Sequence, residues 1–135
     1  MIYHRPIPIE FNHCDPAGIV FYPRYFEMIN SVCENFFKDV AHRPFASMMA
    51  TRQGVPTARV ETTFHAPSRL GETLDFRLQI TRLGTSSITF DITAHAETNR
   101  LTCILTLVWI NPEGRPMPWP DDMRARLAAF LETPQ

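Results

Sequence analysis

Four consecutive stretches between residues 58 and 110 alternate apolar and polar side chains, and this periodicity constrains the fold more than any other feature. The stretches cover residues 58–66, 74–81, 88–97 and 101–110. In the first three, every second residue is apolar, which is typical of strands with one buried face in an antiparallel sheet. The fourth is apolar on both faces, so we expect it in the centre of the sheet or at a subunit interface. Short connections at residues 84–86 and 98–100 predict hairpins.

A long helix is predicted ahead of these strands, over residues 24–40. Its apolar residues recur at spacings of three and four: Tyr25, Met28, Ile29, Val32, Cys33, Phe36, Phe37 and Val40. A stripe this wide indicates a helix buried against a sheet or another subunit. The remaining elements are a first strand at residues 2–11 with Ile7, Ile9 and Phe11 on one face, a loop with a possible helical turn at 41–56, a proline-rich loop at 111–120 and a short helix at about 121–131. The sheet and the long helix satisfy each other if the sheet wraps the helix.

Length and charge exclude several classes of protein. The 135 residues suit one domain, and 13 basic against 14 acidic residues leave a net charge of −1, so we expect no nucleic-acid or anionic-membrane partner. No apolar run approaches the roughly 18 residues of a membrane span, and the N-terminus lacks the apolar region of a signal peptide. Three widely spaced cysteines and scattered histidines suggest neither a disulfide framework nor a metal site. We therefore expect a cytoplasmic protein.

Residues 13–23, between the first strand and the long helix, carry the chemistry. Asp15 supplies a carboxylate, Pro16 fixes φ behind it, and Gly18 permits backbone conformations that are closed to other residues. Pro23 suits the first position of a helix, whose N-terminus has free N–H groups and a partial positive charge. Such a site can hold a developing oxyanion beside a nucleophile or base. The spacing alone fits equally a simple turn in which Asp15 accepts local backbone hydrogen bonds.

The run Asp15-Pro16-Ala17-Gly18-Ile19-Val20, then an aromatic residue, Tyr22 and Pro23, followed by an aromatic-rich helix, resembles the signature of the 4-hydroxybenzoyl-CoA thioesterase family. The resemblance extends over nearly the whole chain in the order of its elements. It implies an α+β protein with the hotdog fold, in which a five-stranded antiparallel sheet wraps around a long central helix and a short C-terminal helix follows. Residues 1–135 would form a single hotdog thioesterase domain.

The same resemblance implies an active site. Asp15 would be the catalytic carboxylate, as nucleophile or as general base on water, and the backbone N–H of Tyr22 would hold the thioester carbonyl. Residues that match substrate-contacting positions are His13, Gly18, Phe21, Pro23 and Asn30. Many relatives carry a carboxylate where this chain has Asn30, which changes the chemistry beside the acyl group. Some relatives carry His in place of Tyr22, so the backbone role transfers more safely than a side-chain role.

We therefore expect an acyl-CoA thioesterase that acts on an aryl- or short-chain acyl-CoA. CoA enters only as part of the substrate, with no separate cofactor and no metal. A homodimer or homotetramer is expected, with the acyl pocket between subunits. Five arginines are candidates for the CoA phosphates but are expected by default to be solvated surface residues: Arg59, Arg69, Arg82, Arg100 and Arg115.

Three alternatives stay open at this point. A hydroxyacyl-thioester dehydratase would use a loop histidine and a helix acid, for which His13 with Glu27 or Glu34 is a poor match. A non-catalytic acyl-CoA-binding hotdog protein would share the fold without the reaction. Cys14 as a nucleophile is disfavoured, because the adjacent His13 is poorly placed to activate it.

Overall fold

The computed structural model describes residues 1–134. The strands are β1 (Tyr3–Pro8), β2 (Thr57–Phe64), β3 (Thr73–Leu83), β4 (Ser87–His95) and β5 (Asn99–Val108). The helices are α1 (Pro23–Asp39), α2 (Phe45–Ala50) and α3 (Asp121–Glu132), with a short 3-10 turn, η1 (Phe11–His13), before α1. These elements make the chain an α+β protein, as the residue patterns predict.

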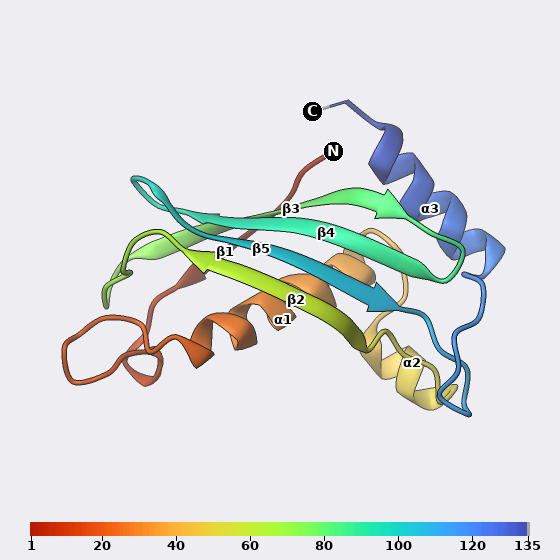
Figure 1. Ribbon diagram of the computed structural model, residues 1–135, viewed down its shortest axis with the longest axis horizontal. Helices are drawn as coiled ribbons and strands as arrows, with labels where there is room; N and C mark the ends of the chain where they lie inside the picture. Colours follow the sequence, from red (N-terminus) through yellow and green to blue (C-terminus); the bar gives the residue numbers. More distant parts are fainter. Residues whose placement is uncertain (135) are drawn as a thin grey trace.

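All five strands form one antiparallel sheet in the order β1-β3-β4-β5-β2. The hairpins β3–β4 and β4–β5 confirm the prediction made from the two short connections. β1 and β2 occupy opposite edges, and β2 reaches its place beside β5 although two strands separate them along the chain. The curved sheet lies over α1, while α2 and α3 lie at the end farthest from the loop before α1 (Figure 1).

The core lies between the inner face of the sheet and α1. Alternate residues of the three inner strands are buried: Leu74, Phe76, Leu78, Ile80, Ile88, Phe90, Ile92, Ala94, Leu101, Cys103, Leu105 and Leu107. Seven residues of α1 face them: Tyr25, Met28, Ile29, Val32, Cys33, Phe36 and Phe37. Every second residue of the inner strands and every third or fourth residue of α1 thus points into the same space. One face of the sheet and one face of the helix therefore bury each other and form the core.

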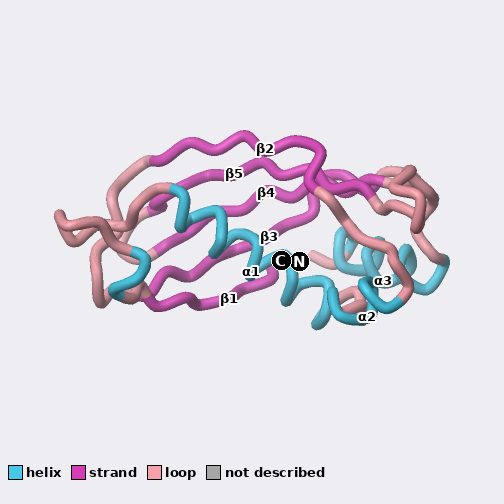
Figure 2. Tube along the Cα trace, turned by 90° about the horizontal axis from the view of Figure 1, so that it is seen from below, coloured by secondary structure: helices cyan, strands magenta, loops and turns pink. Residues whose placement is uncertain are grey.

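The helix crosses the sheet obliquely. Near its start, the rings of Tyr22 and Phe26 lie 6.4 and 6.3 Å from Phe64 at the end of β2. Near its end, Phe36 packs 5.7 Å from Tyr3 of β1, on the opposite edge. Figure 2 shows the same course, with α1 beginning near β2 and ending near β1. As a result, α1 lies under the C-terminal end of β2 but not under its N-terminal end. There, α2 lies under the strand instead.

Two strand predictions are wrong in detail. The first strand ends at Pro8, and Phe11 begins the 3-10 turn with 82% of its surface exposed. The first period-2 stretch forms β2, but it has no buried face: all of its residues except Thr62 are exposed. The reason is its edge position combined with the oblique course of α1, which gives the inward-facing side chains of β2 little to pack against.

Other regions agree with the patterns or refine them. β5, apolar on both faces, lies inside the sheet between β4 and β2. The mixed stretch 41–56 contains the six-residue helix α2. Trp119, from the proline-rich stretch, stacks on Trp109 with ring centroids 5.7 Å apart. Over residues 1–134, no helix has the length and apolar character that crossing a membrane requires.

Candidate active site

The Asp15 loop, residues 13–21, closes on itself ahead of α1. The N–H of Asp15 donates to the carbonyl of Ile19 at 3.0 Å, and the N–H of Gly18 donates to the carbonyl of Asp15 at 2.9 Å. Gly18 has φ of +79°, a left-handed conformation that glycine adopts without steric cost. The N–H of Ala17 donates to Oδ1 of Asp15 at 2.9 Å, so the simple-turn interpretation is correct for this oxygen. The side chain is only partly buried, and Oδ2 accepts no hydrogen bond from residues 1–134.

The start of α1 supplies the second part of the site. Pro23 occupies the first turn of the helix, as predicted, and Tyr22 precedes it with helical φ and ψ of −54° and −34°. Within the described chain, the N–H of Tyr22 donates no hydrogen bond to another backbone group. Pro23 has no N–H, so the N–H of Tyr22 is the backbone donor that directly precedes the helix. The positive end of the helix dipole favours negative charge at this point.

Aromatic side chains form an apolar wall around the helix start. Phe21 and Tyr22 are each about half-exposed and pack edge to face at 5.6 Å. Phe64, at the end of β2, packs against the Tyr22 ring and is also exposed in part. This arrangement provides a surface for an apolar ligand group directly beside the Tyr22 N–H, which has no backbone acceptor in the described part of the chain.

His13, Cys14 and Asn30 make no hydrogen bond to the Asp15 carboxylate within residues 1–134. His13 ends the 3-10 turn, where its Nδ1 accepts the N–H of Glu10 at 2.9 Å, and among the described residues no hydrogen bond joins it to Asp15. The Cys14 thiol donates to the carbonyl of Glu10 at 3.6 Å and has no histidine partner in this part of the chain. Asn30 is exposed on α1, two turns beyond Tyr22, and lines a pocket rather than the Asp15 loop.

A buried ion pair lies beneath the site, and it contradicts the expectation that Arg100 is a solvated surface residue. Arg100 is only 6% exposed. Its guanidinium donates to both carboxylate oxygens of Glu72, at 2.9 and 2.8 Å, and to the carbonyl of Pro67 at 3.0 Å. The same guanidinium lies 3.4 Å from the hydroxyl of Ser68, which accepts the Tyr25 hydroxyl of α1 at 2.9 Å. The network therefore links β5, the loop before β3 and the first turn of α1.

This network also supports the Asp15 loop from below. The N–H of Val20 donates to the carbonyl of Ser68 at 2.9 Å, and the N–H of Leu70 donates to the carbonyl of Gly18 at 3.2 Å. The Arg100 guanidinium, together with the backbone N–H of Arg69, lowers the pKa of Glu72 to about 2. Glu72 therefore stays ionised at neutral pH, and the pair remains charged on both sides.

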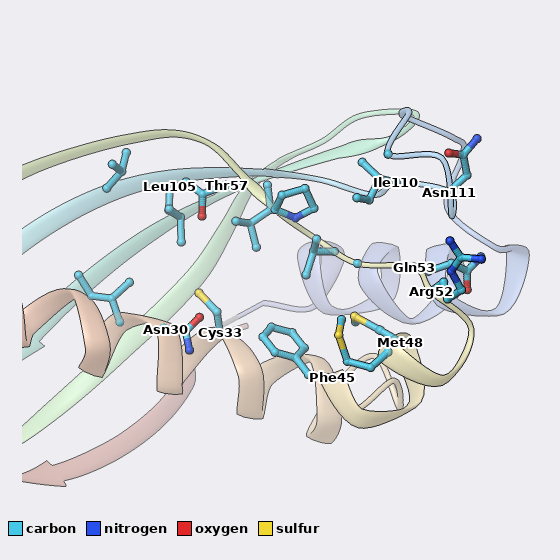
Figure 3. Close-up of a pocket in the computed structure, with 18 of the residues that line it drawn as sticks. Asn30, Cys33, Phe45, Met48, Arg52, Gln53, Thr57, Leu105, Ile110 and Asn111 are labelled. Carbon is cyan, nitrogen blue, oxygen red and sulfur yellow. The ribbon is translucent and has the colours of Figure 1, made fainter.

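A pocket of about 670 Å³ opens beside α1, under β2 and β5. Phe26, Asn30 and Cys33 line it from α1, Met48 from α2 and Leu105 from β5 (Figure 3). The sequence predicts a loop with a possible helical turn at 41–56; the turn is the helix α2, but its role as a pocket wall is not predicted. The spacing of Phe45, Met48 and Met49, at i, i+3 and i+4, is the local signal that reveals it. Among the described residues, no three histidine, cysteine or acidic side chains converge as a metal site would require.

This chain belongs to the thioesterase superfamily, whose family model matches residues 17–103. The match includes Gly18, Tyr22 and Asn30 and begins two residues after Asp15. A curated relative, the 4-hydroxybenzoyl-CoA thioesterase of Pseudomonas sp. (strain CBS-3), is 33% identical over 58 residues, which cover 42% of this chain and 41% of the relative. The chain thus matches about two fifths of the length of that relative.

Solved structures share the fold at low sequence identity. A 1,4-dihydroxy-2-naphthoyl-CoA thioesterase from Synechocystis superposes with a TM-score of 0.87 at 19% identity, over 99% of this chain and 100% of that chain. A hypothetical protein from Staphylococcus aureus, solved in complex with CoA, gives 0.91 at 15% identity, over 98% and 85% of the two chains. These likenesses establish the hotdog fold.

Proposed function

We propose that this protein is a cytoplasmic acyl-CoA thioesterase, with Asp15 as the catalytic carboxylate and the backbone N–H of Tyr22 as the oxyanion donor. One observation carries the proposal: a partly exposed carboxylate lies on the loop that leads directly into a helix whose preceding N–H has no backbone partner within residues 1–134. Membership of the thioesterase superfamily supports hydrolysis of a thioester in general.

Asp15 can act in either of two ways. As a general base, its carboxylate takes a proton from a water molecule while the water oxygen attacks the thioester carbon. As a nucleophile, a carboxylate oxygen attacks the same carbon to give a mixed anhydride, which water then hydrolyses. In both routes the carbonyl oxygen becomes an oxyanion, and its collapse expels the CoA thiolate. A single preorganised donor such as the Tyr22 N–H typically contributes about 3–4 kcal/mol to such a step.

The other predicted residues have supporting roles in this proposal. Gly18 keeps the loop turned so that the backbone can approach the thioester, and Pro23 starts the helix behind it. Phe21 flanks the carbonyl with an exposed ring. His13, whose Nδ1 accepts the Glu10 N–H, ends the 3-10 turn that precedes Asp15. Asn30 faces the acyl part of the substrate from α1.

The test is release of free CoA thiol by the purified protein from a panel of benzoyl-, 4-hydroxybenzoyl-, phenylacetyl-, short-chain and long-chain acyl-CoA. We expect turnover of at least one member. Tight binding across the panel without any turnover, by folded protein, would contradict the proposal and favour a non-catalytic acyl-CoA-binding protein. Hydration of an enoyl-CoA would favour the dehydratase instead.

We also propose that two copies pair through β2. This edge strand contains no proline or lysine, and Val60 and Phe64 expose 49% and 44% of their surface, although the strand carries the exposed Arg59 and Glu61 and a register irregularity between Thr57 and Arg59. Together with the exposed Tyr22, which precedes α1, and Phe26 of α1, Val60 and Phe64 form an apolar surface next to strand hydrogen-bonding groups that no other strand of residues 1–134 pairs with. Antiparallel pairing of two β2 strands covers both and continues the sheet, with the closed two-fold symmetry that most oligomers have.

We expect the wild-type protein to sediment at micromolar concentration as a dimer or as a pair of dimers. Val60→Lys should shift it toward monomer, because a charge at the centre of β2 opposes edge pairing. Thr85→Lys, in the exposed turn between β3 and β4, is the matched control and should leave the sedimentation unchanged. A wild-type protein that stays monomeric under these conditions contradicts the pairing.

A further inference from the structure

The pocket beside α1 is too large for a single aromatic ring. It begins at Phe26, one helical turn after Tyr22, and extends along α1 to α2. A cavity of about 150 Å³ lined by aliphatic and aromatic side chains is enough to bind benzene. The volume of about 670 Å³ is therefore more than four times that of a cavity large enough for one ring. A ring attached to a carbonyl at the Tyr22 N–H would fill only the end near Phe64 and leave the rest empty.

The walls indicate what the pocket prefers. Its interior is made by apolar side chains from both sides, among them the buried Met48, whose flexible thioether adapts to differently shaped ligands. Of residues 1–134, Arg52 is the only charged one that lines it. Figure 3 places Arg52 with Gln53 and Asn111 at the end far from Asn30, so the length between them is lined mainly by carbon and sulfur atoms.

Within the described chain, Asn30 is the only α1 side chain on the pocket wall that carries a nitrogen or oxygen atom. At 1.5 Å per residue it lies about 12 Å along the helix axis from Tyr22. A short acyl group bound at the helix start does not reach it, whereas an extended chain passes it. An uncharged amide at this position tolerates an apolar chain better than a carboxylate would, because a carboxylate loses more hydration when a chain covers it.

We infer that this pocket binds the acyl part of the substrate, and that its preferred acyl part is an extended, uncharged apolar chain rather than a single hydroxylated ring. The inference rests on the proposed function for the position of the thioester at the helix start. It departs from the aryl- or short-chain preference expected from sequence, because the open volume and the apolar walls are properties of the folded chain.

The first test is binding to Asp15→Asn protein, which keeps the pocket and removes the proposed catalytic carboxylate. Dissociation constants would be measured by calorimetry for butyryl-, hexanoyl-, octanoyl- and decanoyl-CoA. Each buried CH₂ should tighten binding about fourfold until the pocket is filled. We expect decanoyl-CoA, which has six more CH₂ groups, to bind on the order of 1,000-fold tighter than butyryl-CoA, and 4-hydroxybenzoyl-CoA to bind no better than hexanoyl-CoA.

The second test changes Asn30 in the same background. Asn30→Asp should weaken decanoyl-CoA at least tenfold and butyryl-CoA less than twofold, because only the longer chain covers position 30. Asn30→Leu should bind decanoyl-CoA as tightly as the parent or more tightly. Asn35→Asp introduces the same charge on α1 outside the pocket and should change neither constant by more than twofold.

These measurements separate the two proposals. Equal affinity along the chain-length series, or tightest binding by 4-hydroxybenzoyl-CoA, overturns the acyl-chain inference whatever the turnover. Preference for dodecanedioyl-CoA over dodecanoyl-CoA overturns it as well, because a chain long enough to pass Asn30 would then place a terminal carboxylate at Arg52. Failure of wild-type protein to hydrolyse any of these thioesters overturns the proposed function alone, since the binding series needs no catalysis.

Discussion

Replacing Asp15 by Asn should lower kcat for acyl-CoA hydrolysis by about 10²–10⁴-fold, the usual contribution of a positioned general base. Asn can neither accept the proton of the attacking water nor act as the carboxylate nucleophile. Its side-chain oxygen can still accept the N–H of Ala17, which Oδ1 of Asp15 accepts at 2.9 Å. The loop should therefore keep its shape, and KM and the melting temperature should change little. Thiol-release kinetics and a thermal melt of the same preparations measure both quantities.

Two matched variants on α1 show whether the loss is specific. Glu27 is an exposed helix acid paired with Arg24 at 2.9 Å, and Glu34 is exposed about two turns further along. Glu27→Gln and Glu34→Gln remove a carboxylate of the kind a dehydratase would need. We expect each to retain thioesterase activity within about twofold, as surface substitutions usually do. An Asp15→Asn protein with near wild-type turnover contradicts the proposed role of Asp15.

Replacing Arg100 by Met should lower the free energy of unfolding by about 3 kcal/mol, because removing one partner leaves a largely buried carboxylate without its counter-charge. Removing one partner of a buried ion pair usually costs about 3–5 kcal/mol. We expect the lower value here, because the Glu72 side chain is still 28% exposed. Arg59, which pairs with Glu61 on exposed β2, provides the matched control. Arg59→Met should change the stability by less than about 0.5 kcal/mol. Urea denaturation of the three proteins measures these differences.

The stability lost in Arg100→Met should also depend on pH. Hydrogen bonds from the Arg100 side chain, and then from the Arg69 N–H, lower the pKa of Glu72 from 4.5 to about 2 in the folded protein. A carboxyl with a lowered pKa stabilises the fold above its unfolded pKa, and this contribution is lost as pH falls through the folded pKa. The difference between wild type and Arg100→Met should therefore be constant above about pH 5 and shrink toward pH 2. A difference that stays constant down to pH 2 contradicts the ion-pair origin.

The activity of Arg100→Met gives a further check on the site. Ser68 and Leu70, which flank the ion pair, hold Val20 and Gly18 of the Asp15 loop through backbone hydrogen bonds. Loosening this support should lower kcat even at temperatures where the variant is fully folded. Arg100→Lys keeps the charge and should recover part of the stability, although a lysine cannot reproduce the two-pronged contact with Glu72.

The amino-acid sequence by itself determines the elements and the chemistry of the loop. Apolar spacing of two residues in the strands and of three and four in α1 is local, so it can be read without any knowledge of distant contacts. The same holds for Pro23 at the helix start and for the Asp15 turn, whose hydrogen bonds stay within a few residues.

Only the tertiary structure decides what depends on residues far apart in the chain. The exposure of β2, the oblique course of α1 and the pocket between them follow from pairing β2 with β5 and β1 with β3. The burial of Arg100 depends on Glu72, which lies 28 residues earlier in the chain. No local pattern encodes such distances, because the same alternation would fit an inner or an edge strand, and an isolated arginine resembles a surface residue until its partner is placed beside it.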